Sequence, residues 1–263
     1  MSIKEYWTNK DQRAEQAVKH TARMEREFSE FIENSIRDTI YFFPGFECKK
    51  KVEEKDTEII VDDMDSVGAI FKYNTAGQKA AVLNFASYKN PGGHFIGGSK
   101  AQEECLCHES YLYNVLSQIT DYYEWNNQHK NKALYLDRAL YSPNILFLRE
   151  ENKMSIMKYY DVITCAAPNK TAAQKYCNVS DEENTKVLRS RIKFVLDIAK
   201  NMEVETLILG AYGCGVFGQD PMDVASIFKE YLDTTHKCFN KVVFAIPKGN
   251  NGNYDAFERV FKE

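Results

Sequence analysis

Two stretches of the chain combine glycines with residues that could perform chemistry. The first, NFASYKNPGGHFIGGSKAQEECLCHE at residues 84–109, has four glycines followed by the adjacent acids Glu103 and Glu104. Glycine lets the backbone approach a ligand closely, and a carboxyl group can donate or accept a proton during a reaction. Acidic residues in the first turn of a helix also simply stabilise the helix, so the acids alone do not identify a site.

The second stretch, LGAYGCGVFGQDP at residues 209–221, has the order strand, glycine-rich loop and helix that binds phosphate through backbone amides. It does not match the dinucleotide fingerprint and has no Gly-Lys-Ser/Thr, which excludes the ordinary phosphate-loop and kinase sites. A plain glycine-rich turn explains the glycines equally well. Phe217 favours a ligand site, because a ring in a mobile, glycine-flanked loop is poorly placed for core packing and well placed to stack on a ribose or base.

The overall charge limits the partners of such a site. The chain of 263 residues has 34 basic and 38 acidic side chains, a net charge of −4. This balance gives no general attraction for nucleic acid or an anionic membrane. We therefore expect no direct nucleic-acid binding and no membrane association, and a polyanionic ligand would have to be held by a local site.

The cysteines and the first residues bear on the compartment. Seven cysteines without paired spacing indicate a reducing environment. The start, MSIKEYWTNKDQRAEQ, lacks the apolar run of a signal peptide, and no stretch is long and apolar enough to span a bilayer. We expect a cytoplasmic protein, or a nuclear one if the organism is eukaryotic.

An alternation of strands and helices must position the two stretches. Apolar residues at helical spacing over residues 14–36 predict one long helix or a broken pair, and the segment around Pro44 and Gly45 predicts a connector. We therefore divide the chain into a helical N-terminal extension, residues 1–50, and an α/β domain, residues 51–263. Residues 120–143 show no clear period and receive no assignment. The expected strands are at 58–61, 80–86, 145–148, 160–166, 206–209 and 242–246, and the expected helices are at 66–72, 102–119, from 181, from 221 and after 253.

The motifs resemble those of a known enzyme family. A glycine triplet, about seven residues and then Gln-Glu-Glu is the signature of poly(ADP-ribose) glycohydrolases, and NPGGHFIGGSKAQEE is similar to it. The form NFAS-x-x-NPGG, the sequence VITCAAPN at 162–169 and the GAYGCGVFG loop resemble the bacterial, or microbial, branch. The match keeps its order and spacing from about residue 57 to residue 247. The resemblance implies a macrodomain-like, three-layer α/β fold in which a mixed sheet lies between helices.

The resemblance also implies an activity and a set of site residues. The activity is hydrolysis of the ribose–ribose O-glycosidic bonds of poly(ADP-ribose), with ADP-ribose as product and no cofactor. Glu104 would be the catalytic acid, Glu103 would bind ribose hydroxyls, and Gln102 would hold the loop. The second loop would wrap the diphosphate, with Phe217 on the distal ribose. The implied ligand-binding residues are Asn90, Gly92, Gly93, His94 and Gln102 in the first loop and Gly213, Cys214, Gly215, Val216 and Phe217 in the second.

The chemistry explains why two neighbouring carboxyl groups are useful. The oxocarbenium-like transition state needs a proton on the leaving oxygen, and repulsion between two carboxylates near phosphates raises the pKa of at least one. We expect Glu104 to be protonated and Glu103 ionised, and Glu104 then activates water. No metal is required. The Cys-x-Cys-His run from Cys105 to His108 points in different directions on a helix, so we expect Cys105 to pack, His108 to lie at the surface and no zinc to bind.

One departure from the family signature leaves alternatives open. His94 occupies the third glycine position. Its side chain could clash, tune the site or act as a second acid or base, and we expect it to be tolerated and to point outwards. Two other functions remain: a non-catalytic reader of ADP-ribose, and a hydrolase of mono-ADP-ribosylated proteins or nucleic acid. The expected partners are thus poly(ADP-ribose) or ADP-ribosylated proteins.

Overall fold

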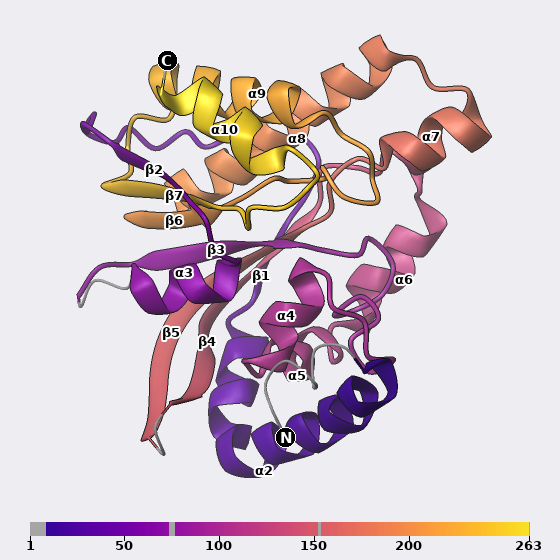
Figure 1. Cartoon of the computed structure of the whole chain (residues 1–263), viewed down its shortest axis with the longest axis vertical. Helices are drawn as coiled ribbons and strands as arrows, with labels where there is room; N and C mark the ends of the chain where they lie inside the picture. Colours follow the sequence, from indigo (N-terminus) through magenta and orange to yellow (C-terminus); the bar gives the residue numbers. More distant parts are fainter. Residues whose placement is uncertain (1–8, 74–76, 152–153, 263) are drawn as a thin grey trace.

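A computed structural model describes residues 9–73, 77–151 and 154–262, which form a seven-stranded mixed sheet with helices on both faces (Figure 1). The strand order is β1-β4-β5-β3-β6-β7-β2. The expected α/β class, with a mixed sheet and an N-terminal helix, is confirmed. The strands are β1 (Ile40–Phe42), β2 (Glu58–Asp62), β3 (Ala80–Phe85), β4 (Ala139–Glu151), β5 (Met154–Cys165), β6 (Thr206–Leu209) and β7 (Lys241–Ala245).

The direction of the strands brings the two glycine-rich stretches together. Strands β5, β3, β6, β7 and β2 pair in parallel, while β4 and β1 are antiparallel additions. Strands β3 and β6 are direct neighbours, with Val82 opposite Ile208. The loops that follow β3 and β6 therefore leave the same edge of the sheet side by side, which is where ligands bind in open α/β sheets.

Two cores, one on each face, make the sheet the middle layer of three. Along β3, Ala81 and Leu83 face a core formed with α8, α9 and α10, whereas Val82 faces a core formed with α2, α3, α4 and α5. Figure 1 shows these two groups of helices on opposite sides of the sheet. The helices are α2 (Lys10–Arg37), α3 (Ser66–Lys72), α4 (Gln102–His108), α5 (Leu112–Leu116), α6 (Thr120–Gln128), α7 (Lys170–Cys177), α8 (Asp181–Asn201), α9 (Pro221–Thr234) and α10 (Asn253–Lys262), with a 3-10 turn at Asn131–Ala133.

The prediction of a single helix over residues 102–119 is wrong. This segment is divided into α4 and α5 because Ser110 leaves the helical path to form a β-bridge with Phe147. The Ser110 hydroxyl donates to Leu106 O (2.7 Å) and accepts from Leu112 N (3.0 Å), which satisfies backbone groups at the break. Helix α7 was not predicted, and residues 120–143 hold α6 and the start of β4.

The N-terminal helix reaches the loop that follows β3. Arg13 Nε of α2 donates to Gly98 O at 2.8 Å. A Cβ atom at Gly98 would collide with backbone atoms of Lys10 and Ala14, so the main chain of the helix lies directly on this glycine. Residues 1–8, which carry half of the stretch interpreted as lacking a signal peptide, lie outside the described residues.

The proposed boundary between an extension and a domain at residue 50 stays a prediction. Strand β1 lies before that boundary and pairs antiparallel with β4, from Ile40 opposite Tyr141 to Phe42 opposite Ala139. The sheet therefore includes a strand from the segment assigned to the extension. No helix in the described ranges is long and apolar enough to cross a membrane.

Candidate active site

A cavity of about 550 Å³ opens at the edge where β3, β6 and β7 end. The first glycine-rich loop and the start of α4 form one wall, and the second loop forms another. Among the residues of the described chain that line it, Lys100 is the only basic one. The expected site residues that line it are Gly93, Gln102, Glu103, Glu104, Gly213, Gly215, Val216 and Phe217.

Gln102 fixes the start of α4 to the end of β3. Its side-chain oxygen accepts from Phe85 N (2.8 Å) and its amide donates to Leu83 O (2.8 Å) and to Ser66 Oγ (3.1 Å). The side chain thus occupies main-chain positions that a neighbouring strand would otherwise satisfy. The two glutamates that follow Gln102 are placed relative to the sheet with little freedom.

Glu103 is buried and held through both carboxyl oxygens. It is 3% exposed. Its Oε1 accepts from Asn84 Nδ2 (3.2 Å) and its Oε2 accepts from Ser87 N (2.7 Å). Asn84 comes from β3 and Ser87 from the loop directly after it, so the carboxyl group ties α4 to the end of this strand.

Glu104 has one bound oxygen and one free oxygen. It is 6% exposed, and its Oε1 accepts from the backbone N–H of His94 at 2.9 Å. Within the described part of the chain, its buried Oε2 has no hydrogen-bond partner. A buried polar atom without a partner is costly and often marks a functional group.

Gly93 is the position where the backbone comes closest to both acids. Its φ is +62°, and a Cβ atom there would lie 2.5 Å from Glu104 Oε1 and 3.0 Å from Glu103 Oε2. Any side chain would therefore be strained by the backbone and would displace a carboxyl group. The N–H of the next residue, His94, binds Glu104 Oε1 at 2.9 Å.

Burial raises the pKa of Glu103 to about 8. Hydrogen bonds from Ser87 N–H and Asn84 oppose the shift, the charge of Glu104 adds to it, and the N–H of Gly92 also favours the ionised form. This direction is opposite to an ionised Glu103, and which member of the pair is ionised stays a prediction. Desolvation of this carboxyl group outweighs the hydrogen-bond donors that it receives.

The second loop offers unpaired backbone amides to the cavity. Gly213 has a φ of +78°, and a Cβ atom there would lie 2.9 Å from Ala167 Cβ, so the turn needs glycine. The N–H groups of Gly215, Val216 and Phe217 donate no hydrogen bond to any described part of the protein. Consecutive free amides form an anion-binding concavity.

Phe217 is partly buried and packs against other rings, so the expectation that it avoids core packing is wrong. Its ring meets the Tyr135 ring edge-on, with centroids 6.2 Å apart. Thr171 N donates to Phe217 O at 3.1 Å. The ring lines the cavity and rests on an aromatic support, which gives it a defined place.

Four expected ligand-binding residues do not line the cavity. Asn90 is exposed and closes a turn, since its O accepts from Gly93 N (3.1 Å). Gly92 packs on Tyr113, where a Cβ atom would meet the ring at 2.7 Å. His94 is exposed and its ring covers Gly97, which agrees with an outward orientation. Cys214 packs against the core formed with α8, α9 and α10.

A third wall of the cavity was not predicted. It is formed by Asp65, Ser66 and Val67 at the start of α3, and by residues that follow β7. The signal that could have found it is topological, because parallel neighbouring strands end at the same edge of a sheet. The residues after β7 are Ile246, Pro247, Asn251 and Asn253.

The Cys-x-Cys-His run is a packing feature. Cys107 is buried and Cys105 packs partly against the core, as expected for Cys105. His108 is 9% exposed and stacks edge-on with Phe95 at 4.7 Å, so its expected surface position is wrong. No group of three His, Cys, Asp or Glu side chains in the described ranges is arranged to hold a metal ion.

Comparisons with known proteins agree on one family. The family described as "Microbial-type PARG, catalytic domain" matches residues 11–150. The poly(ADP-ribose) glycohydrolase of Thermomonospora curvata is similar in structure, with a TM-score of 0.85 and 29% identity over 95% of this chain and 99% of that chain. Its complex with the inhibitor ADP-HPD gives a TM-score of 0.82 at the same identity and coverage.

A second solved relative is more similar in sequence. A variant of the poly(ADP-ribose) glycohydrolase of Deinococcus radiodurans, in complex with ADP-ribose, is 32% identical over 88% of this chain and 97% of that chain, with a TM-score of 0.80. A search of curated protein sequences gives no match.

Proposed function

Because the chain belongs to the microbial-type poly(ADP-ribose) glycohydrolase family and is a glycoside hydrolase that acts on poly(ADP-ribose), we propose a role for each wall of its cavity. The observation that carries the proposal is the free, buried Oε2 of Glu104 in a cavity that also presents the unpaired amides of residues 215–217. An acid and an anion site thus share one cavity.

The cavity holds the terminal ADP-ribose unit of the polymer. Its volume of about 550 Å³ is in the range of small-molecule sites. The amides of Gly215, Val216 and Phe217 bind the diphosphate, which agrees with Lys100 being the only basic side chain among the described residues that line the cavity. The Phe217 ring supports the terminal ribose near the two glutamates. The adenosine then occupies the third wall, between the start of α3 and the segment after β7.

Ligand binding decides which glutamate holds the proton. Ribose hydroxyls that donate to Glu103 favour its ionised form, in addition to the bonds from Ser87 and Asn84. Burial favours one proton shared between the two carboxyl groups. With Glu103 ionised, this proton lies on the free Oε2 of Glu104. The expectation of an ionised Glu103 and a protonated Glu104 therefore describes the complex with substrate.

Glu104 protonates the leaving oxygen as the bond between the two riboses breaks. The terminal ribose becomes oxocarbenium-like, and the ionised Glu103 and the diphosphate stabilise its positive charge. The deprotonated Glu104 next removes a proton from water, which attacks the ribosyl carbon and releases ADP-ribose. The His94 N–H holds Oε1 throughout, so that Oε2 alone exchanges the proton.

The test is the substitution Glu104→Gln. The amide keeps the bond from His94 N–H but cannot transfer a proton, so release of ADP-ribose from poly(ADP-ribose) should fall by about 10²–10⁴-fold. Calorimetry should show ADP-ribose binding nearly unchanged. Glu109→Gln, at the other end of α4, is the matched control and should keep full activity. Near-normal cleavage by Glu104→Gln would assign the acid to another residue.

The same assay separates the other two functions. A reader of ADP-ribose would bind the product and leave the polymer intact in the wild-type protein. Its site would need no buried pair of acids, and Glu103 and Glu104 are 3% and 6% exposed. A hydrolase restricted to mono-ADP-ribosylated proteins would release ADP-ribose from those proteins but not from the polymer.

We also propose that the protein works in the cytoplasm. All seven cysteines are free, and three of them, Cys107, Cys165 and Cys238, are buried as thiols. Free thiols persist in a reducing compartment. Fractionation of the source cells with an antibody to the protein tests this location.

A further inference from the structure

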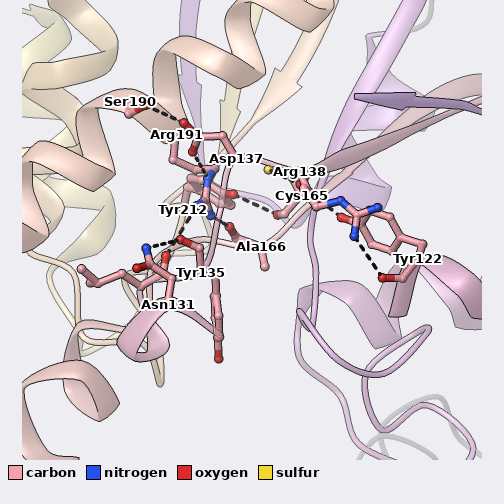
Figure 2. A network of polar contacts seen from close by, with 11 residues as sticks. Tyr122, Asn131, Tyr135, Asp137, Arg138, Cys165, Ala166, Ser190, Arg191 and Tyr212 are labelled. Atoms are coloured by element: carbon pink, nitrogen blue, oxygen red, sulfur yellow. Dashed lines mark hydrogen bonds and ion pairs between the residues drawn. The ribbon is translucent and has the colours of Figure 1, made fainter. Parts of the chain in front are cut away.

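A fully buried arginine on α8 joins three segments of the chain. Arg191 of α8 is 0% exposed. Its Nε donates to Asp137 Oδ1 at 2.6 Å and its Nη1 donates to Ala166 O (Figure 2). Its Nη2 donates to Leu134 O at 3.5 Å. Ser190 Oγ binds the other oxygen of Asp137 at 2.5 Å. One guanidinium therefore ties α8 to the end of β5 and to the segment before β4.

The segment bound by this arginine has an unusual backbone. Positive φ values occur at four residues that are not glycine: Asn131 (43°), Lys132 (52°), Ala133 (64°) and Tyr135 (63°). Such conformations cost free energy and persist only where surrounding contacts impose them. The contacts here are the bonds from Arg191 to Leu134 O, from Asn169 N to Ala133 O (3.0 Å) and from the Asn131 amide to Tyr135 O (2.9 Å).

The strained segment brings Tyr135 into contact with one ring from each glycine-rich stretch. The Tyr135 ring stacks on the Tyr88 ring, with centroids 4.2 Å apart and an interplanar angle of 12°. It also meets the Phe217 ring edge-on at 6.2 Å. Tyr88 directly follows Ser87, whose N–H binds Glu103. A displacement of Tyr135 would therefore reach Phe217 and the support of Glu103 together.

We propose that Arg191 and Asp137 are positioning residues of the glycohydrolase reaction. They hold the 131–135 segment in its strained form so that Tyr135 fixes Phe217 at the terminal ribose and Tyr88 beside Ser87, whose N–H binds Glu103. The inference rests on the proposed function of the cavity. Arg191 makes no hydrogen bond to Glu103 or Glu104 in the described structure. Its effect on their geometry passes through Leu134, Ala166 and the Tyr135 ring. The substrate group that this positioning affects is the terminal ADP-ribose unit, whose ribose Phe217 is proposed to support.

A second buried charge cluster provides a matched control. Asp197, also on α8, is 4% exposed and binds Lys193 Nζ (2.8 Å) and His236 Nε2 (3.2 Å). None of these three residues lines the cavity. Asp197→Asn therefore removes a buried charge from the same helix at a residue that binds Lys193 and His236 and not the 131–135 segment. It is the control for lost stability.

The experiment compares Arg191→Met, Arg191→Lys and Asp137→Asn with Asp197→Asn, at a temperature well below the melting temperature of each variant. Lysine keeps the charge but cannot bind Asp137, Leu134 O and Ala166 O together. Each of the three test variants should lower kcat/KM for poly(ADP-ribose) at least tenfold and weaken ADP-ribose binding. Asp197→Asn should lower the melting temperature and keep both values within twofold of wild type.

A double-mutant cycle tests the path through the ring. Tyr135→Leu should lower kcat/KM as Arg191→Met does, and Tyr135→Phe, which keeps the ring, should restore it to within about threefold of wild type. Combining Tyr135→Leu with Arg191→Met should cause little further loss. If Arg191→Met does not fold, the cycle is measured with Asp137→Asn, whose side chain is 20% exposed.

Additive losses of kcat/KM in the cycle would overturn the proposal, because Arg191 and Tyr135 would then act independently. A loss of kcat/KM in Asp197→Asn as large as in the test variants would also overturn it, because lost stability alone would then explain the effect. A wild-type protein that releases no ADP-ribose from the polymer would instead refute the proposed function. In that case the affinity for ADP-ribose, measured in the same variants, still decides the role of Arg191 in positioning Phe217.

Discussion

Replacing Glu103 with glutamine should stabilise the protein at pH 8 while it weakens the binding of ADP-ribose. Burial raises the pKa of this carboxyl group from 4.5 to about 8. At about 1.4 kcal/mol per pKa unit, keeping it charged in the folded protein costs up to about 5 kcal/mol. Glutamine removes that cost. The side-chain oxygen of the new glutamine can accept from Ser87 N–H. Its NH2 group can donate to Asn84 Oδ1 if the Asn84 amide flips, and this oxygen has no partner in the described structure.

The sign of the pH dependence follows from the direction of this shift. Below pH 4.5 the Glu103 carboxyl is protonated in the folded and the unfolded chain, and the full stability is present. Between pH 4.5 and about 8 the unfolded chain releases the proton first, so stability falls as pH rises. Above pH 8 both states are ionised and the loss is complete.

The assay is urea unfolding of wild type and Glu103→Gln at pH 5 and pH 8. The gain in unfolding free energy caused by the substitution should be several kcal/mol larger at pH 8 than at pH 5. Glu109→Gln should show no such difference. An equal effect of Glu103→Gln at both pH values would mean that Ser87 and Asn84 keep the carboxyl ionised, and the desolvation argument would fail.

Three further substitutions probe the cavity. Phe217→Ala should raise the ADP-ribose Kd and lower kcat together, as measured by calorimetry and steady-state kinetics, and a loss of stability with normal kinetics would make Phe217 a core residue only. His94→Gly should leave turnover near wild type because the ring is exposed and only its backbone binds Glu104; loss of activity with an intact fold would give the imidazole an active role. Gly93→Ala should lower turnover by about 10²-fold or more, because the new Cβ would lie 2.5 Å from Glu104 Oε1. It should also lower the unfolding free energy by at least about 1 kcal/mol, because the φ of this residue is +62°. Wild-type kinetics would show that the close approach of Gly93 to Glu104 is not needed.

The parts of the site that could be predicted from the sequence have local signals. The two glycine-rich loops, the acids after Gln102 and the ring of Phe217 are adjacent in sequence to the strands and helices that position them. The cap of α8, where Ser180 accepts from Glu183 N at 3.1 Å, is local in the same way. These contacts span a few residues, so residue type and spacing are enough to indicate them.

The parts that could not be predicted depend on distant contacts. The break between α4 and α5 is imposed by Phe147, and the third wall of the cavity appears only when β2 and β7 end beside β3 and β6. The raised pKa of Glu103 depends on how many atoms exclude water from it, which the neighbouring sequence does not contain. Arg191 gives no sequence signal, since an arginine on a helix is normally exposed.

The contact between α2 and Gly98 couples the N-terminal helix to the loop that carries Gly93. Main chain meets main chain there, with Arg13 Nε bound to Gly98 O. The helix therefore constrains position 98 by shape, while its buried residues Ala17, Met24 and Ile32 fix the helix to the core. A gene fusion or insertion that shifted the first turn of the helix would move the loop that carries Gly93. The first turn of the helix and the catalytic loop therefore hold each other in place, although Arg13 and Gly98 are 85 positions apart in the sequence.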